Sequence, residues 1–228
     1  MELYLDHFFK VLDKDGFKSA TKVLSKFPNV NIRENASLEE SWKGIYLKAE
    51  DGSYLEILEE SPYWTEEKFG FGLSRFGKEK DVHEQLKNLH PDFDWEQREQ
   101  FRPDGTPWFK YTQLSSCQEK CFFWAADYQG ESAKKPVQQD QSPGIKSFKT
   151  LKVKVQKDQI SEILKGFRWI SPRADRESKI VVPVQGGRTF SIEIDPVPEA
   201  KNSFELEVID LNGDLKSLKF GKAVSKLV

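Results

Sequence analysis

Two residues in the N-terminal part of the chain, His7 and Glu56, carry side chains that could perform chemistry together. His7 lies in an apolar run at the start of the sequence, and Glu56 lies about fifty residues downstream. Imidazole and carboxylate are side-chain types that divalent transition metals prefer, and a carboxylate beside an imidazole is also a plausible general base. The two residues therefore predict half of a metal site or a metal-free acid–base pair. The alternative is a structural role, in which His7 is a partly buried strand histidine satisfied by Glu56 or by backbone.

The segment that contains both residues has the pattern of one strand, one helix and three further strands. Asp13 or Asp15 can cap the helix, whose apolar residues fall on one face. A hairpin turn is predicted at Glu50-Asp51-Gly52 because this polar, glycine-containing stretch separates two apolar runs. The strands are expected at residues 3–12, 30–33, 42–49 and 54–59.

The same order of elements occurs twice more along the chain. Aligning Leu24 with Leu86 places each element of the second unit opposite its counterpart in the first, which predicts an internal repeat of about 62 residues. The second unit is expected to have strands at residues 69–75, 94–101, 108–114 and 121–128, with a helix at 78–89. The third is expected to have strands at 148–155, 180–184, 189–194 and 204–211, a helical stripe that begins at Ile160, and a last short strand near 218–220.

We therefore predict an α+β fold in which paired βαβββ modules form a curled mixed sheet around a cleft, with a third, related βαβββ-like C-terminal segment. The stretch 129–143 is polar and lacks large apolar residues, which is typical of a linker. The predicted division is 1–64 for the first module, 65–128 for the second, 129–144 for the linker and 145–228 for the C-terminal segment.

Composition limits the classes of partner. The 35 basic and 37 acidic residues are nearly balanced, so no charge pattern for nucleic acid or an acidic membrane is present. No apolar stretch approaches the roughly 18 residues that span a bilayer, and no signal peptide is visible. Cys117 and Cys121 are most simply a reduced pair. These features predict a cytoplasmic protein whose partner is a small organic molecule, with no nucleic acid and no membrane; they leave the oligomeric state open.

Several short motifs resemble the vicinal oxygen chelate superfamily, which comprises glyoxalases, bleomycin-resistance proteins and extradiol dioxygenases. The motifs are LDHF at residues 5–8, GSYLEIL at 52–58, FGFGLS at 69–74, RPDG at 102–105 and FFW at 122–124. The resemblance covers about residues 1–130 by motif and 145–211 by element order. It implies that two modules curl around a cavity and that a metal takes one ligand from the first strand and one from the fourth strand of each module.

The metal site that the resemblance implies is incomplete in this chain. His7 and Glu56 match the ligand types of the first module. In the second module the helix register places Phe69 or Phe71 opposite His7, and Trp124 lies opposite Glu56. None of these three side chains binds a metal, and a catalytic ion normally has at least three protein ligands. We therefore predict no cofactor and leave a divalent metal at His7 and Glu56 as an open alternative.

The third segment offers the remaining candidate ligands, Glu205 and Glu207, on its expected fourth strand. If either joined His7 and Glu56, the ligand set would be larger. A second subunit could also contribute.

The sequence as a whole favours a glyoxalase-like small-molecule-binding protein with an aromatic cleft. His7 and Glu56 are the candidate catalytic residues, and the candidate ligand-binding walls are Trp42, Tyr54, Trp108 and Trp124. Aromatic side chains commonly line such clefts, although they also fill cores. One alternative is a metal-dependent lyase, isomerase or dioxygenase of the superfamily. Another is a protein-interaction or assembly module whose concave sheet receives a partner segment. Whether the protein is an enzyme stays open.

Overall fold

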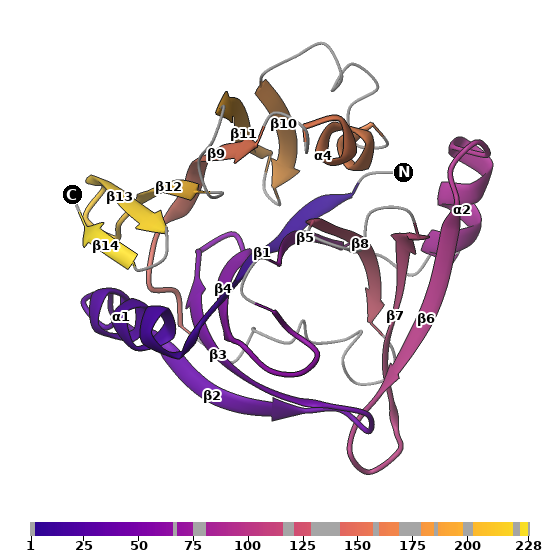
Figure 1. The fold of residues 1–228 in the computed structure, drawn as a ribbon, viewed down its shortest axis with the longest axis horizontal. Helices are drawn as coiled ribbons and strands as arrows, with labels where there is room; N and C mark the ends of the chain where they lie inside the picture. The colour runs from indigo at the N-terminus through magenta and orange to yellow at the C-terminus, as the bar shows by residue number, and fades with distance from the viewer. Residues whose placement is uncertain are drawn as a thin grey trace.

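The protein folds into two mixed β-sheets with helices packed against them (Figure 1). The computed structural model describes residues 3–65, 68–74, 81–115, 121–128, 142–156, 160–168, 179–184, 187–197, 203–220 and 224–227. Within this part of the chain the larger sheet has eight strands and the smaller has six. The predicted mixed α+β class is confirmed.

The first five elements follow the predicted order of strand, helix and three strands. Asp13 caps the helix, because its Oδ1 accepts a hydrogen bond of 2.6 Å from the Gly16 backbone N–H. The turn after the third of these strands contains Gly52 at φ 93°, a backbone conformation that favours glycine. The elements are β1 (Tyr4–Leu12), α1 (Lys14–Leu24), β2 (Asn31–Ala36), β3 (Ser41–Lys48) and β4 (Tyr54–Glu59).

The next five elements repeat this order. Asp81 caps the second helix by accepting a hydrogen bond of 2.8 Å from the His83 N–H. The helix begins at Val82, and residues 75–80, where its earlier start was predicted, lie outside the described residues. The elements are β5 (Phe69–Ser74), α2 (Val82–Leu89), β6 (Trp95–Phe101), β7 (Pro107–Leu114) and β8 (Cys121–Tyr128).

The eight strands of these two segments form one sheet, in the order β2-β3-β4-β1-β5-β8-β7-β6. Its centre is the antiparallel pair of β1 and β5. On its other side β1 runs parallel to β4, and β5 runs parallel to β8. The sheet curls so far that its opposite ends meet, since the Leu38 N–H beyond β2 donates a 3.0 Å hydrogen bond to the Phe101 carbonyl of β6. The Trp42 and Trp108 rings, one from each half of the sheet, also stack on each other, with ring centroids 6.1 Å apart.

The smaller sheet has a strand order that corrects one expectation. Its order is β10-β11-β9-β12-β13-β14. The first strand of this segment, β9, runs parallel to the third strand, β11, and antiparallel to the fourth, β12. In the first segment, by contrast, the first strand β1 runs parallel to the fourth strand β4. The element order of a third βαβββ unit is therefore present without its strand arrangement. The elements are β9 (Ser147–Gln156), α4 (Ile160–Phe167), β10 (Lys179–Val184), β11 (Arg188–Val197), β12 (Ser203–Ile209), β13 (Leu215–Phe220) and β14 (Val224–Leu227).

Cross-strand charge explains why β12 can lie beside β9. Glu205 lies opposite Lys152 in the β9–β12 register, and Lys152 Nζ is 2.7 Å from Glu207 Oε1. Opposite charges on neighbouring strands stabilise their pairing. The order of elements along the chain does not determine which strand edge a later strand joins, so this arrangement could not be predicted from it.

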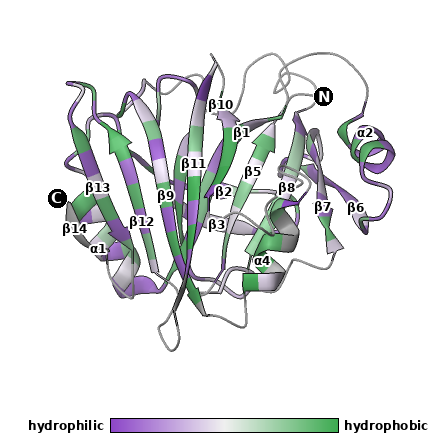
Figure 2. Cartoon of the chain, turned by 90° about the horizontal axis from the view of Figure 1, so that it is seen from above, coloured by the Kyte–Doolittle hydropathy of each residue, from purple (hydrophilic) through white to green (hydrophobic). Residues whose placement is uncertain are grey.

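The smaller sheet packs face to face against the larger one. Hydrophobic and hydrophilic residues alternate along its strands (Figure 2), as expected for strands with one buried face. Phe204 of β12 contacts Phe69 and Phe8, with ring centroids 4.8 and 6.0 Å apart, and Phe167 of α4 packs on Phe123 at 4.4 Å. The two sheets share one hydrophobic core, so the inner face of the curled sheet is the one left for a cavity.

Some predictions fall on residues that the structure does not describe. Residues 129–141 of the predicted linker and Cys117 are among them, so the linker and the domain boundaries stay predictions. Cys121 is buried in β8. Within the described chain, none of the helices has the length and apolar character needed to cross a membrane.

The shared core predicts that the two sheets unfold together. Replacing the fully buried Phe204 in Phe204→Ala should lower the free energy of unfolding by about 3–5 kcal/mol because it removes packing on both sheets. Chemical denaturation followed by tryptophan fluorescence and by circular dichroism should give one coincident transition. The control Leu215→Ala, at a residue that is 50% exposed on the same sheet, should change stability by less than about 0.5 kcal/mol. Separate transitions for the two sheets would contradict the shared core.

Candidate functional site

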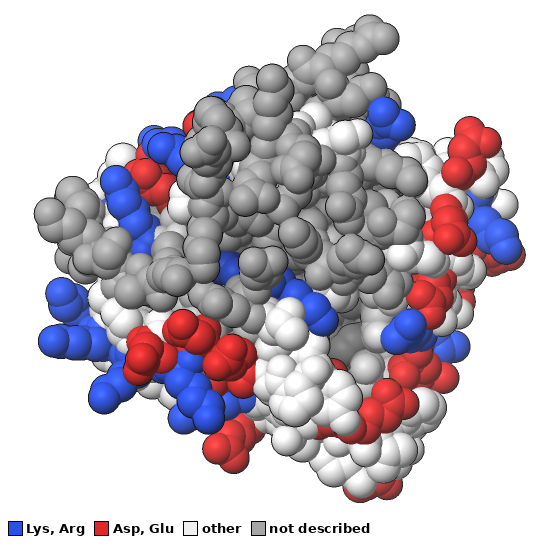
Figure 3. All heavy atoms as spheres, viewed as in Figure 1, with Lys and Arg blue, Asp and Glu red and all other residues white. Residues whose placement is uncertain are grey.

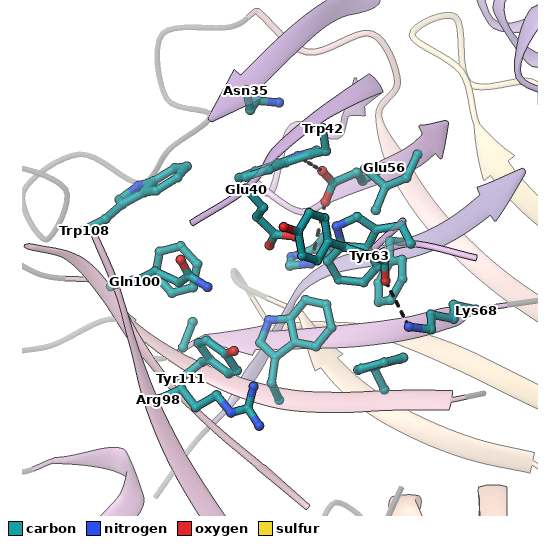
Figure 4. A pocket seen from close by; sticks show the side chains of 18 of the residues that line it. Asn35, Glu40, Trp42, Glu56, Tyr63, Lys68, Arg98, Gln100, Trp108 and Tyr111 are labelled. Carbon is teal, nitrogen blue, oxygen red and sulfur yellow. Dashed lines mark hydrogen bonds and ion pairs between the residues drawn. The ribbon is translucent and has the colours of Figure 1, made fainter. Parts of the chain in front are cut away.

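A cavity of about 270 Å³ lies on the inner face of the curled sheet. Strands from both halves of the sheet line it, and aromatic side chains make up most of its wall (Figure 4). All six candidate residues line this cavity: His7, Trp42, Tyr54, Glu56, Trp108 and Trp124. The structure thus brings together residues up to 117 positions apart in the sequence. Their roles in binding or catalysis stay predictions.

A β-bulge in β1 places Asp6 beside His7. The register of β1 with β5 shifts between Leu5 and His7, which leaves Asp6 as the extra residue. Side chains of consecutive residues in a regular strand point to opposite faces, whereas a bulge changes their direction. Here Asp6 Oδ2 lies 2.7 Å from His7 Nδ1, and both residues are buried.

This contact determines which nitrogen of His7 is available to the cavity. A carboxylate can only accept, so Nδ1 carries the proton in the pair and Nε2 is left as the acceptor when the ring is neutral. The Tyr128 hydroxyl donates a second hydrogen bond, of 3.1 Å, to Asp6 Oδ2. His7 Nε2 lies 3.9 Å from Glu56 Oε2.

A second hydrogen-bonded group holds the Glu56 carboxylate. Its Oε1 accepts from the Tyr46 hydroxyl at 2.6 Å and from Trp42 Nε1 at 3.3 Å. Asn35 Nδ2 donates to the same Tyr46 hydroxyl at 2.6 Å. Tyr46 and Trp42 lie on β3, next to the strand that carries Glu56, and Asn35 supports Tyr46 from β2 on the far side of β3.

Aromatic rings pack against His7 in the wall of the cavity. The Tyr54 ring stacks on the imidazole at 4.7 Å with an interplanar angle of 18°, and the Trp124 ring is tilted against it at 5.1 Å. Burial, followed by the negative charge of Asp6, raises the pKa of both Tyr54 and Tyr128 well above the usual value. Both phenols therefore stay protonated and can act as hydrogen-bond donors.

The strand registers correct the predicted counterpart of His7. Glu56 pairs with Phe9 and its counterpart Trp124 with Gly72, so the counterpart of His7, two residues before Phe9, is Gly70. Phe69 and Phe71 lie on the outer face and belong to the core shared with the smaller sheet. The inner face carries Gly72 opposite His7 and Gly70 opposite Phe9. A Cβ atom added to Gly72 would overlap the His7 imidazole, so the space that a side chain would need is already filled by the ring.

The remaining acidic candidates lie away from the cavity. Glu205 and Glu207 point from the outer side of β12, opposite the buried Phe204 and Leu206. Glu207 pairs with Lys152 at 2.7 Å, and Glu205 accepts a 2.8 Å hydrogen bond from the Ser217 hydroxyl. The hypothesis that these carboxylates join His7 and Glu56 is therefore wrong for the described structure.

The donor set does not fit a tightly held metal ion. Among the described residues, no group of three or more His, Cys, Asp or Glu side chains is placed to hold one. His7 Nε2 and Glu56 Oε2 could both face an ion, but the inner positions on β5 and β8 are occupied by glycine and Trp124. Two protein ligands are fewer than a catalytic ion normally has.

The close contact between Gly72 and the His7 ring predicts that a larger residue at position 72 destabilises the protein. Gly72→Ala should lower the free energy of unfolding by about 1–3 kcal/mol because the added methyl group displaces the buried imidazole. The same change made in a His7→Ala background should cost much less, and a double-mutant cycle by urea denaturation measures the difference. An equal cost in both backgrounds would show that the ring is not what restricts this position.

The incomplete donor set predicts weak metal retention. After dialysis against excess Zn²⁺, Mn²⁺ and Fe²⁺ and removal of unbound ions, elemental analysis should find well below one ion per chain. One tightly held ion per chain, lost in His7→Ala, would instead support the metal-dependent alternative.

The similar solved structures that we describe share little sequence identity with the chain. No curated protein matches the sequence. Among solved structures, the chain is similar to a putative dioxygenase from Bacillus subtilis, with 15% identity, 86% of this chain and 63% of that chain covered, and a TM-score of 0.37. It is also similar to a glyoxalase I mutant from Zea mays, with 9% identity, 88% of this chain and 72% of that chain covered, and a TM-score of 0.28. The chain thus spans less than two thirds of the Bacillus subtilis protein.

A family model provides the assignment. The model of DUF5829, described as a family of unknown function, matches residues 5–190. The match begins in β1 and runs into β11, so it includes every strand that lines the cavity. Because it covers most of the sequence, the chain belongs to the family of unknown function DUF5829.

Proposed function

We propose that this protein is a glyoxalase-like small-molecule-binding protein whose ligand occupies the cavity of the curled sheet. His7 and Glu56 are the polar contacts for the ligand, and Trp42, Tyr54, Trp108 and Trp124 form its aromatic walls. One observation carries the proposal: two fixed polar groups, Asp6–His7 and Tyr46–Glu56, end at the same aromatic cavity.

The symmetry of the larger sheet supports the glyoxalase-like part of the proposal. From the central β1–β5 pair outward, both halves have the order first strand, fourth strand, third strand and second strand. We interpret the halves, residues 1–64 and 65–128, as two paired βαβββ modules. In this interpretation each module supplies one side of the cavity, with Trp42 and Trp108 on the equivalent third strands, β3 and β7.

The cavity has the physical character of a ligand site. Small-molecule sites combine mostly apolar walls with a few fixed polar groups, and this cavity lies just below the usual range of about 300–1,000 Å³. Side chains that are already fixed by packing and hydrogen bonds lose little entropy when a ligand binds. The Tyr54–His7 stack and the Tyr46–Glu56 hydrogen bond fix lining side chains in this way. The size suits a molecule of one or two rings.

The Asp6–His7 pair supports proton transfer as a second candidate function. Asp6 accepts from Nδ1 and orients the imidazole, which leaves Nε2 available to take a proton from a bound molecule. Glu56 Oε2, 3.9 Å from Nε2, is close enough to share a bound donor group. Metal-assisted chemistry has less support, because the described residues supply two ligands.

Ligand binding predicts a rise in melting temperature and a change in tryptophan fluorescence. A screen of aromatic and heterocyclic metabolites should yield compounds that stabilise the protein by about 2.7 kcal/mol at a hundredfold excess over Kd. Trp108→Ala should weaken binding of such a compound by about 0.5–1.5 kcal/mol or more, since it removes one stacking wall.

The matched control is Trp95→Ala. Trp95 packs on Phe93, and its Nε1 donates to the His90 carbonyl outside the cavity, so this variant should keep the ligand affinity. A broad screen that changes neither melting temperature nor fluorescence, together with co-purification of another polypeptide, would favour the assembly module instead.

A further inference from the structure

We infer, on the basis of the proposed function, that the ligand is a flat aromatic molecule with a protonated nitrogen, and that this cationic group binds at Glu56 Oε2. The inference concerns the chemical class of the ligand and follows from the distribution of charge, hydrogen-bond acceptors and aromatic faces around the cavity.

The first observation is the unequal use of the two Glu56 oxygens. Oε1 accepts hydrogen bonds from Tyr46 and Trp42, whereas Oε2 accepts none from the described residues. The side chain is only 12% exposed, and the nearest cationic partner, His7 Nε2, is 3.9 Å away. A carboxylate oxygen that lines a cavity and has no protein donor can accept a hydrogen bond from a ligand. A charged N–H donor forms a stronger hydrogen bond with a carboxylate than a neutral donor does.

The second observation is the excess of negative charge at the His7 end of the cavity. Asp6 and Glu56 lie on either side of the single imidazole, so a negative charge remains even when His7 is protonated. After burial, these two carboxylates contribute to the raised pKa of Tyr54 and Tyr128. Lys48, the register partner of Tyr54 on β3, does not line the cavity.

Two of the three Lys and Arg side chains of the lining are engaged elsewhere. Arg98 pairs with Glu96 at 2.7 Å and is about half exposed, and Lys68 Nζ donates to the Tyr63 carbonyl at 3.0 Å (Figure 4). The third, Arg33, lies over the Tyr46 ring at 4.5 Å, and its buried Nε has no hydrogen-bond partner among the described residues. Arg33 is therefore the lining cation that a cationic ligand must avoid, and Glu56 Oε2, beside His7, is the acceptor to which it can bind.

Aromatic faces complete the preference for a cation. The Trp124 and Tyr54 rings lie around His7 beside this acceptor, and Trp42, which donates to Glu56 Oε1, stacks on Trp108. The faces of aromatic rings attract cations, and desolvation increases the attraction. Glu40 is a second carboxylate of the lining. Figure 3 shows Lys/Arg and Asp/Glu side chains side by side on the described part of one face, so selection for a cation depends on the cavity and not on that surface.

Three probes with the same indole ring test the inference. Tryptamine carries a cation, tryptophol a neutral hydroxyl and indole-3-acetate an anion, and isothermal titration calorimetry at pH 7 measures the affinity of each. Tryptamine should bind about tenfold more tightly than tryptophol because its N–H donors are charged, and indole-3-acetate should bind most weakly.

Two variants on β4 locate the effect. Glu56→Gln keeps the side-chain shape and should reduce the preference for tryptamine over tryptophol to less than about threefold. Glu59→Gln is the matched control, because Glu59 lies on the same strand, pairs with Lys43 at 3.6 Å and does not line the cavity. This control should keep the tenfold preference. The order of the three affinities in the unmodified protein tests the inference even if Glu56→Gln does not fold.

Each contrary outcome has a distinct meaning. Tryptophol or indole-3-acetate binding as tightly as tryptamine overturns the cation inference, while the proposed binding function stands. A preference that survives in Glu56→Gln overturns the assignment of the cation to this carboxylate. Failure of all three probes to bind at millimolar concentration overturns the inference and also counts against a cavity that accepts ring compounds.

Discussion

The antiparallel pairing of β1 with β5 is the contact on which both the core and the cavity depend. It joins the two halves of the larger sheet and sets which side chains face each way. On the outer face, Phe8 and Phe71 contact one another and enter the core shared with the smaller sheet. On the inner face, Gly70 and Gly72 leave space that the side chains opposite them occupy. The same register therefore buries one face of β1 in the core and presents His7 to the cavity.

The polar groups at the cavity are costly to bury, and the network around them offsets this cost. An unpaired charge in a low-dielectric interior is strongly destabilising, whereas one with hydrogen-bond partners is tolerated. Asp6 is held by His7 and Tyr128, and one oxygen of Glu56 is held by Tyr46 and Trp42. The second oxygen of Glu56 has no donor among the described residues, and the residue lines the cavity, where a ligand can reach it.

Local pattern was sufficient to predict much of the fold. Strands β4 and β8 were predicted with the bounds that the structure has, because their apolar runs are bounded by turn or polar residues. The cap at Asp13 followed from its place before an amphipathic helix. The candidate site residues came from their types and from family resemblance, and the structure places them around one cavity.

Other features depend on pairing between distant strands, which local pattern does not specify. Asp6 contacts His7 because of a bulge, and only a register shift against β5 reveals it. Phe69 and Phe71 were aligned with His7 by way of the helices, but the strand register places glycines on that face. Tyr46 alternates with core residues in β3 and Asn35 with exposed residues in β2, and neither gave a signal of its link to Glu56. The position of β12 beside β9 likewise depends on which edge is available.

The central claim is that a ligand binds at the cavity end where His7 and Glu56 meet. The most direct measurement is ¹⁵N NMR of the histidine rings, because the chain has only three histidines and a His7→Gln variant assigns the signal of interest. His83 and His90 belong to α2 and its C-cap, outside the cavity lining, and serve as internal references. Titration with tryptamine should shift the Nε2 resonance of His7 in a saturable manner and leave the other two rings unchanged. Saturable binding that leaves the His7 resonances unchanged, or that shifts only His83 or His90, would contradict the account.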